Sequence, residues 1–222
     1  MGAPDALRAW LAVRETVPWD AVRPPAEPAA GPLVPVRDGA AHDIGTVDRA
    51  RSPERADGML AALDRVRADA AAGARPTFDL LQGWQRHVLG GPAPPRTGAA
   101  FAKAGRERYG LLPDLRERLD ACLGQATGPE PPLAARAARA YLDVCFFHPF
   151  EDGNGRSAFL TVVFLLAREG VALDQVGPLR RVARHADDPR GALALADLLA
   201  VLIDAARRRA VRPGRPAHSA RR

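Results

Sequence analysis

One short polar stretch of the sequence combines residue types that could do chemistry together. Residues 148–156 read His-Pro-Phe-Glu-Asp-Gly-Asn-Gly-Arg. They lie between two segments with helical patterns, residues 133–147 and 157–168. The second segment is almost wholly apolar, which is the pattern of a buried helix. Charged groups at the start of a buried helix are unfavourable unless they have a partner or a ligand.

The residues in the second half of this stretch suit the binding of an anion. Gly153, Asn154 and Gly155 can turn the chain tightly and expose backbone N–H groups at the start of a helix, where phosphate groups often bind. Arg156 adds a charged planar fork that matches phosphate oxygens. Asp152 is the kind of single carboxylate that holds Mg²⁺ together with the phosphates of a substrate.

The first residue of the stretch suits proton transfer. His148 has the side chain whose ordinary pKa is closest to neutral pH, as a general base requires. A base, a carboxylate for a metal, an anion site and a fixed cation are the components needed to transfer a phosphorus group to a hydroxyl.

The stretch resembles the signature of Fic proteins, His-x-Phe-x-Asp/Glu-Gly-Asn-Gly-Arg-x-x-Arg. Every specified position from His148 to Arg156 matches, which is far more specific than a lone glycine motif. The resemblance covers about residues 77–200. It implies an all-α fold, a Fic-type helical bundle with a short β-hairpin flap before the motif helices.

The resemblance also implies an activity and a role for each motif residue. Most characterised Fic proteins move AMP from ATP to a Ser, Thr or Tyr hydroxyl of a target protein. By this resemblance His148 is the base, Asp152 is the Mg²⁺ ligand, and Gly153–Gly155 form the anion hole. Arg156 holds the nucleotide phosphates, and Phe150 is a buried anchor for the loop. ATP is then the co-substrate.

A second resemblance concerns the target protein. In Fic proteins a β-hairpin flap ahead of the motif often carries an Arg-Thr pair and lines up the target segment by strand addition. Arg96-Thr97 is similar to this pair and is the candidate here, with a plain loop as the alternative interpretation.

The chain departs from the signature where the second motif arginine would fall, because this residue is Phe159. Doc toxins, a related branch that phosphorylates a hydroxyl, also lack this arginine, but they have a lysine where this chain has Gly155. That glycine favours nucleotidyl transfer. A Doc-like protein kinase and a catalytically degenerate Fic-fold binding module are the alternatives.

Position 159 itself allows two placements. Phe159 follows Arg156 by three residues, so both are expected on one face of a helix, pointing toward the phosphates. An arginine introduced there would then strengthen ATP binding. The alternative is that Phe159 packs in the core.

A simpler interpretation of the stretch is a turn between two core helices, with Asn154 capping the second helix. Turn chemistry accounts for the glycines, the asparagine and the aspartate. It does not account for His148 and Arg156 at their spacing from the turn.

Composition limits the possible partners. The 222-residue chain has a net charge of +6, but seven arginines and no acid lie in residues 207–222, so the rest of the chain carries −1. A solvated tail is therefore expected there and a nucleic-acid partner is not. The cysteines match no disulfide framework or zinc spacing. A separate antitoxin is a partner that the resemblance allows.

The sequence shows no signal-peptide pattern and no apolar run long enough to span a bilayer. We therefore expect a cytoplasmic protein with no membrane partner.

The predicted organisation is one core with an extension at each end, which suits the chain length. Further helices are predicted from apolar periodicity over residues 6–15, 53–71, 77–89, 113–126 and 190–208. The predicted units are residues 1–72, an N-terminal helical extension packed on the core with a Pro/Ala-rich loop at 23–40; residues 73–206, the Fic-like core; and residues 207–222, a disordered Arg-rich tail.

Overall fold

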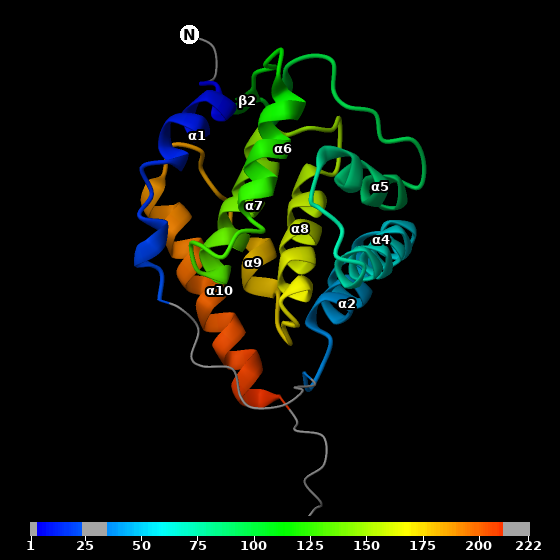
Figure 1. Cartoon of the computed structure of the whole chain (residues 1–222). Helices are drawn as coiled ribbons and strands as arrows, with labels where there is room; N and C mark the ends of the chain where they lie inside the picture. Colours follow the sequence, from blue (N-terminus) through cyan, green and yellow to red (C-terminus); the bar gives the residue numbers. More distant parts are fainter. Residues whose placement is uncertain (1–3, 24–34, 211–222) are drawn as a thin grey trace, which may run out of the picture.

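Helix α7 (Leu133–Phe147) lies at the centre of the fold, and nearly all of its residues are buried. Its alanines have small side chains, which lets neighbouring helices approach closely. In the computed structural model, which describes residues 4–23 and 35–210, α7 contacts α8 (Asn154–Arg168) and α10 (Pro189–Arg209) (Figure 1). Helices α6 (Leu115–Gln125) and α1 (Ala6–Arg14) also pack against α7.

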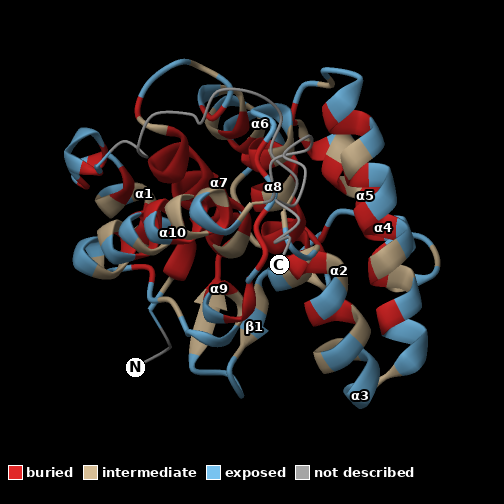
Figure 2. Ribbon diagram, turned by 90° about the horizontal axis from the view of Figure 1, so that it is seen from below, coloured by how far each residue is buried: buried red, intermediate tan, exposed pale blue. Residues whose placement is uncertain are grey.

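Helix α8 is the second buried helix, as its apolar pattern predicts. It packs between α7 and a pair of outer helices, α4 (Pro53–Ala71) and α5 (Phe78–Leu89). The outer helices are amphipathic, and Figure 2 shows pale exposed faces on them and red buried residues along α7 and α8. The order α10, α7, α8 and then α4 with α5 sets the layers of the bundle.

A two-stranded antiparallel hairpin precedes the motif. Strand β1 (Ala100–Ala102) pairs with β2 (Glu107–Tyr109) in the register Ala100 to Tyr109 and Phe101 to Arg108. The predicted class, a helical bundle with a short β-hairpin before the motif helices, is confirmed.

Side chains cap the starts of two outer helices. The Thr77 hydroxyl accepts a hydrogen bond from the backbone N–H of Leu80, and Ser52 caps α4 with Pro53 in its first turn. Helix α8 begins three residues earlier than predicted, at Asn154. The last helix also extends one residue further at each end than predicted.

Several short elements escaped prediction because they are too brief to show periodicity. They are a 3₁₀ turn (Trp19–Ala21), α2 (Gly39–Asp43), a π-helical turn (Ile44–Asp48), α3 (Arg49–Arg51) and α9 (Gly177–Arg181). Three of them, α2, the π-helical turn and α3, form a continuous helical approach to α4.

The predicted tail needs one correction. Arg207, Arg208 and Arg209 belong to α10, so the helix continues past the predicted boundary at residue 207. Residues 211–222 of that tail, and 24–34 of the predicted Pro/Ala-rich loop, lie outside the described residues. Within the described ranges, none of the helices is both long and apolar enough to cross a membrane.

A buried ion pair joins the N-terminal helix to the central helix. The carboxylate of Asp143, on α7, has no solvent exposure and accepts bonds from Arg14 Nε at 2.7 Å and Nη2 at 3.0 Å. The indole N–H of Trp10 donates to the same carboxylate at 2.9 Å. Both charges are therefore paired and hydrogen-bonded inside the protein, as buried charges must be.

This pair predicts a strong effect on stability. Arg14→Met should lower the free energy of unfolding by about 3–5 kcal/mol, because it leaves the Asp143 carboxylate buried and unpaired. The matched control is Arg8→Met on the same helix, which removes an exposed arginine 3.8 Å from Asp5 and should cost no more than about 1 kcal/mol. Urea denaturation of both variants measures the difference. Equal losses would show that the buried pair does not hold α1 to α7.

Candidate functional site

A cavity of about 550 Å³ lies over the polar stretch and gathers residues from distant parts of the chain. His148 and residues 151–156 line it. The remaining lining comes from the π-helical turn, α3, α4, β1, α7 and α9. It includes Asp48, Arg51, Ser52, Arg55, Phe101, Tyr141 and Arg180. Its volume falls in the usual range of small-molecule sites. The predicted site residues 148 and 152–156 are thus brought to one cavity.

His148 ends α7 in an unusual conformation. Its backbone is left-handed, with φ 48° and ψ 56°, a region that non-glycine residues seldom occupy. The imidazole stacks on the ring of Tyr109, with centroids 4.1 Å apart and planes 16° from parallel. The Nδ1 atom lies 3.3 Å from the carbonyl oxygen of Cys145. A carbonyl can only accept, so this contact places the proton of the neutral ring on Nδ1 and leaves Nε2 as an acceptor.

The surroundings of His148 favour this neutral ring. Burial lowers the pKa of His148 below its ordinary value, and the bond to the carbonyl of Cys145 opposes that shift without reversing it. A neutral imidazole with a free Nε2 is the form that a general base requires.

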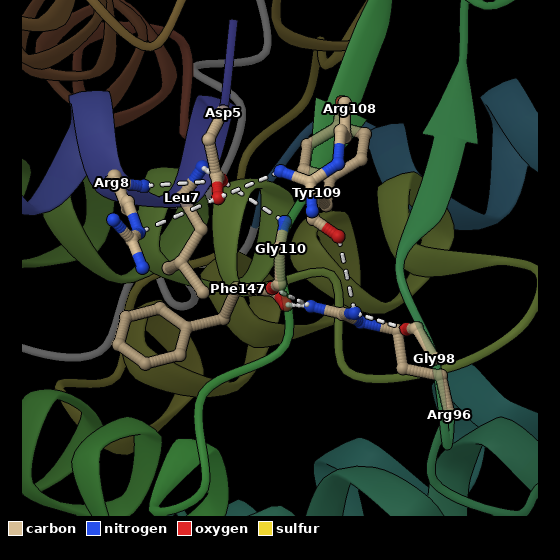
Figure 3. A network of polar contacts seen from close by, with 9 residues as sticks. All are labelled: Asp5, Leu7, Arg8, Arg96, Gly98, Arg108, Tyr109, Gly110 and Phe147. Carbon is tan, nitrogen blue, oxygen red and sulfur yellow. Dashed lines mark hydrogen bonds and ion pairs between the residues drawn. The ribbon is translucent and has the colours of Figure 1, made fainter.

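Arg96 holds the chain around His148 from below the surface. Its side chain is buried, and its backbone N–H donates to the carbonyl of Pro149 at 3.1 Å. Figure 3 shows the guanidinium reaching several backbone carbonyls at once. Its Nε donates to the carbonyl of His148 at 2.6 Å. Its other N–H groups donate to the carbonyl oxygens of Phe147, Gly98, Tyr109 and Gly110.

The predicted role of Arg96 therefore needs correction. Its guanidinium is directed into the protein and is occupied by the backbone, so it does not face a target segment. The sequence correctly placed Arg96 next to the hairpin, but it did not indicate that the side chain points into the protein. Thr97 is exposed just before β1, and its contact with a target stays a prediction.

The motif loop is closed by Asn154. Its amide oxygen accepts from the backbone N–H of Phe150 at 2.9 Å, and its amide nitrogen donates to the carbonyl of the same residue at 2.8 Å. Phe150 is buried and packs against Phe78, with ring centroids 5.4 Å apart. Asn154 is thus the first residue of α8 and a clamp on the loop. The interpretation of Asn154 as the helix cap is wrong.

A residue that sequence reasoning missed supports the same loop. Gln85 on α5 is fully buried, and its amide nitrogen donates to the carbonyl of Asp152 at 2.6 Å. A signal was present, because Gln85 lies on the apolar face of α5 between Leu81 and Val88. A lone amide on a buried helix face indicates a polar partner, and here that partner is the backbone of the motif.

The start of α8 is open to a ligand. The N-cap is Gly153, and no side chain caps the first backbone N–H groups of the helix. Gly155 is exposed, and nothing lies within 4 Å of where a Cβ would be. Uncapped N–H groups at the start of a buried helix, facing open space, can bind an anion. The anion-binding role of residues 153–155 stays a prediction, for which this geometry leaves the necessary N–H groups open.

Two charged side chains stand beside this helix start. Arg156 Nη2 donates to Asp152 Oδ2 at 2.9 Å, and its Nη1 donates to the carbonyl of Val88 at 3.2 Å. The Asp152 side chain is 68% exposed, whereas that of Arg156 is 20% exposed. A phosphate that enters the cavity could therefore accept hydrogen bonds from Arg156, and the exposed Asp152 carboxylate could then bind another ligand.

Asp152 fits the predicted magnesium site in one respect. No three His, Cys, Asp or Glu side chains come together as a metal site in the described ranges. Mg²⁺, however, is commonly held by one or two carboxylates plus substrate phosphates. An exposed carboxylate on the cavity wall next to an anion site matches that mode.

Phe159 is not on the cavity wall. Its side chain is 1% exposed and belongs to the hydrophobic core. The expectation that position 159 faces the phosphates is wrong, and the alternative of core packing holds. The helix is buried on that face, and the expected gain in ATP binding from an arginine at 159 no longer follows.

The comparisons with known proteins agree with the geometry. A family model described as Fic/DOC family matches residues 79–166. A solved structure, a Fic domain containing signaling protein from Bacteroides thetaiotaomicron VPI-5482, superposes with a TM-score of 0.54 at 17% identity, covering 70% of this chain and 69% of that one. No curated protein matches the chain significantly. The resemblance to the Fic/DOC family is thereby confirmed for residues 79–166, and the Fic-type fold is confirmed by the structural match.

A matched pair of glycines tests the structure of the loop. Gly153 has φ 79°, and a Cβ there would collide with the amide of Gln85, whereas Gly155 faces open space inside the first turn of α8. Gly153→Ala should therefore lower the free energy of unfolding by more than about 1 kcal/mol. Gly155→Ala should leave it unchanged or raise it slightly. Thermal unfolding compares the two, and equal stability of both variants would contradict the described loop.

Proposed function

Since residues 79–166 are a Fic/DOC-family region within a Fic-type helical fold, we propose that the chain transfers a nucleoside monophosphate, AMP from ATP, to a Ser, Thr or Tyr hydroxyl of a target protein. The observation that carries this proposal is the pairing of two features in one cavity. One is the neutral imidazole of His148 with its free Nε2, and the other is the uncapped start of α8 beside Arg156.

The chemistry assigns one task to each group. The target hydroxyl oxygen attacks the α-phosphorus of ATP, and Nε2 of His148 takes the hydroxyl proton. The bond to the leaving pyrophosphate breaks as the new phosphate ester forms. Negative charge on the phosphoryl oxygens is stabilised by the N–H groups of residues 154–156 and by the guanidinium of Arg156.

Magnesium has a defined place in this scheme. Asp152 would hold Mg²⁺ together with phosphate oxygens, and the ion supplies neutralisation of phosphate charge. The protein itself orients the loop through Gln85 and Asn154, which fix the backbone on both sides of Asp152. Positioning and electrostatic stabilisation are the main contributions a protein makes to phosphoryl chemistry.

The hairpin offers a surface for the target segment. Phe101 on β1 is 62% exposed and lines the same cavity as His148. The β2 edge already bridges Asp5 at Arg108, so the β1 edge is the one to which an extended peptide would add as a further strand. Such a peptide would carry its hydroxyl side chain toward the cavity, next to the base.

The donor and the transferred group are tested with labelled nucleotides. Purified protein with Mg²⁺ and a cell lysate should transfer label from [α-³²P]ATP to protein and none from [γ-³²P]ATP, because the α-phosphoryl group is moved and pyrophosphate leaves. Transfer from the γ-label alone would instead establish a protein kinase. No transfer with any nucleotide would support a binding module that has lost catalysis.

The base is tested by substitution. His148→Ala should reduce transfer at least a hundredfold, the scale of general base catalysis, while ATP affinity stays within a few-fold. The matched control is His87→Ala, an exposed histidine on α5 away from the cavity, which should retain full activity. A His148→Ala protein with normal turnover would show that the base lies elsewhere.

The pH profile gives an independent check of the same residue. The base acts only when unprotonated, so kcat/KM should fall as pH is lowered through the pKa of His148. Burial lowers this pKa, so the midpoint of the acid limb should lie below the ordinary histidine value of about 6.5. Stopped assays across pH 4.5–8 measure it. A midpoint above 6.5 would contradict the buried, neutral ring.

A further inference from the structure

Arg180 is a cavity residue that neither the motif nor the family match includes. It lies on α9, beyond the matched residues 79–166, yet it lines the same cavity as His148 and Arg156. Its side chain is only 14% exposed. A buried arginine on the wall of a polar cavity needs an explanation, because its charge must be satisfied.

The guanidinium of Arg180 is held rigidly from three directions. It lies over the ring of Phe159, 4.9 Å from the ring centroid. Nη1 donates to Asp43 at 2.5 Å, and Nη2 donates to both oxygens of Asp48 at 2.9 and 2.7 Å. Contact with two carboxylates at its edge and an aromatic ring on its face suits the planar guanidinium of arginine better than the ammonium of lysine. Little conformational freedom remains to be lost when a ligand binds.

These contacts leave part of the guanidinium for a ligand. An arginine has five N–H donors, and the described contacts come from Nη1, to Asp43, and from Nη2, to the two oxygens of Asp48. The N–H on Nε and one N–H on Nη1 have no partner among the described contacts. The ion pairs can therefore persist while Arg180 donates two further bonds.

The position along α8 indicates which group Arg180 would meet. Phe159, on which Arg180 rests, follows Arg156 by three residues, close to one helical turn of about 5.4 Å. The two guanidinium groups thus stand near the same end of α8. Arg51 and Arg55, from the α3–α4 corner, line the same cavity and make no side-chain ion pair among the described contacts. The cavity therefore offers cations beyond those next to His148.

We propose that Arg180 binds the distal phosphates of the nucleotide and makes the site prefer a triphosphate to a monophosphate. The proposal rests on the nucleotide-binding function proposed above. The start of α8 and Arg156 hold the phosphate at which the reaction occurs, and Arg180 holds the phosphates that leave. Asp43 is a positioning residue, since it fixes the guanidinium and does not line the cavity, whereas Asp48 fixes the guanidinium from the cavity wall itself.

Isothermal titration with ATP and AMP in the presence of Mg²⁺ tests this assignment. Arg180→Gln should weaken ATP roughly tenfold or more, the scale of a charge-assisted bond, and change AMP by no more than about twofold. The control is Arg181→Gln, because the neighbouring Arg181 is exposed, donates to the carbonyl of Gly177 and lies outside this cavity. It should change neither affinity.

A second variant is needed because Arg180→Gln leaves Asp43 and Asp48 without a cation and could unfold the protein. Arg180→Lys keeps a cation for Asp43 and Asp48 but loses the planar fork, so it should still weaken ATP several-fold and leave AMP unchanged. Unaltered ATP binding in both variants, or equal losses for ATP and AMP, would overturn the role of Arg180. A wild-type protein that binds neither nucleotide would instead overturn the proposed function from which this role follows.

Discussion

The central helix α7 ends inside the protein, and this is the constraint on which the site depends. The last carbonyls of a helix have no partner within it, and here water cannot supply one. Arg96 supplies the donors, bonding the carbonyls of Phe147 and His148 from a buried position. The same contacts hold His148 in a left-handed conformation that its own backbone would not prefer. The requirement to satisfy a buried helix end thus also directs the imidazole toward the cavity.

This network extends to the N-terminal part of the chain. Arg96 bonds the carbonyl of Gly110, and Asp5, the cap of α1, accepts from the N–H of Gly110 at 3.0 Å (Figure 3). Helix α1 is in turn tied to α7 by Arg14 and Asp143. The N-terminal region also supplies Arg51 and Arg55 to the cavity. Residues 79–166 therefore carry the motif, but the cavity around it is completed by segments that precede and follow this region.

The features that the sequence predicted well have local causes. Two apolar helices flank the motif, as their periodicity and length indicate, whereas the hairpin was expected only from the family resemblance. Short helices such as α2, α3 and α9 lack enough turns to show a period. They were missed, and with them the part of the cavity wall that Arg51 and Arg180 form.

By itself the sequence determined the chemical identity of the motif and the helical class of the fold, since residue type, spacing and apolar period are properties of neighbouring residues. Only the tertiary structure decided where long side chains point. Arg96 is buried and donates hydrogen bonds to backbone carbonyls. Phe159 is a core residue, and Arg180 from another helix stacks on its ring. These outcomes depend on which surfaces pack together, because a helix face is buried or open according to its neighbours and not according to its own sequence.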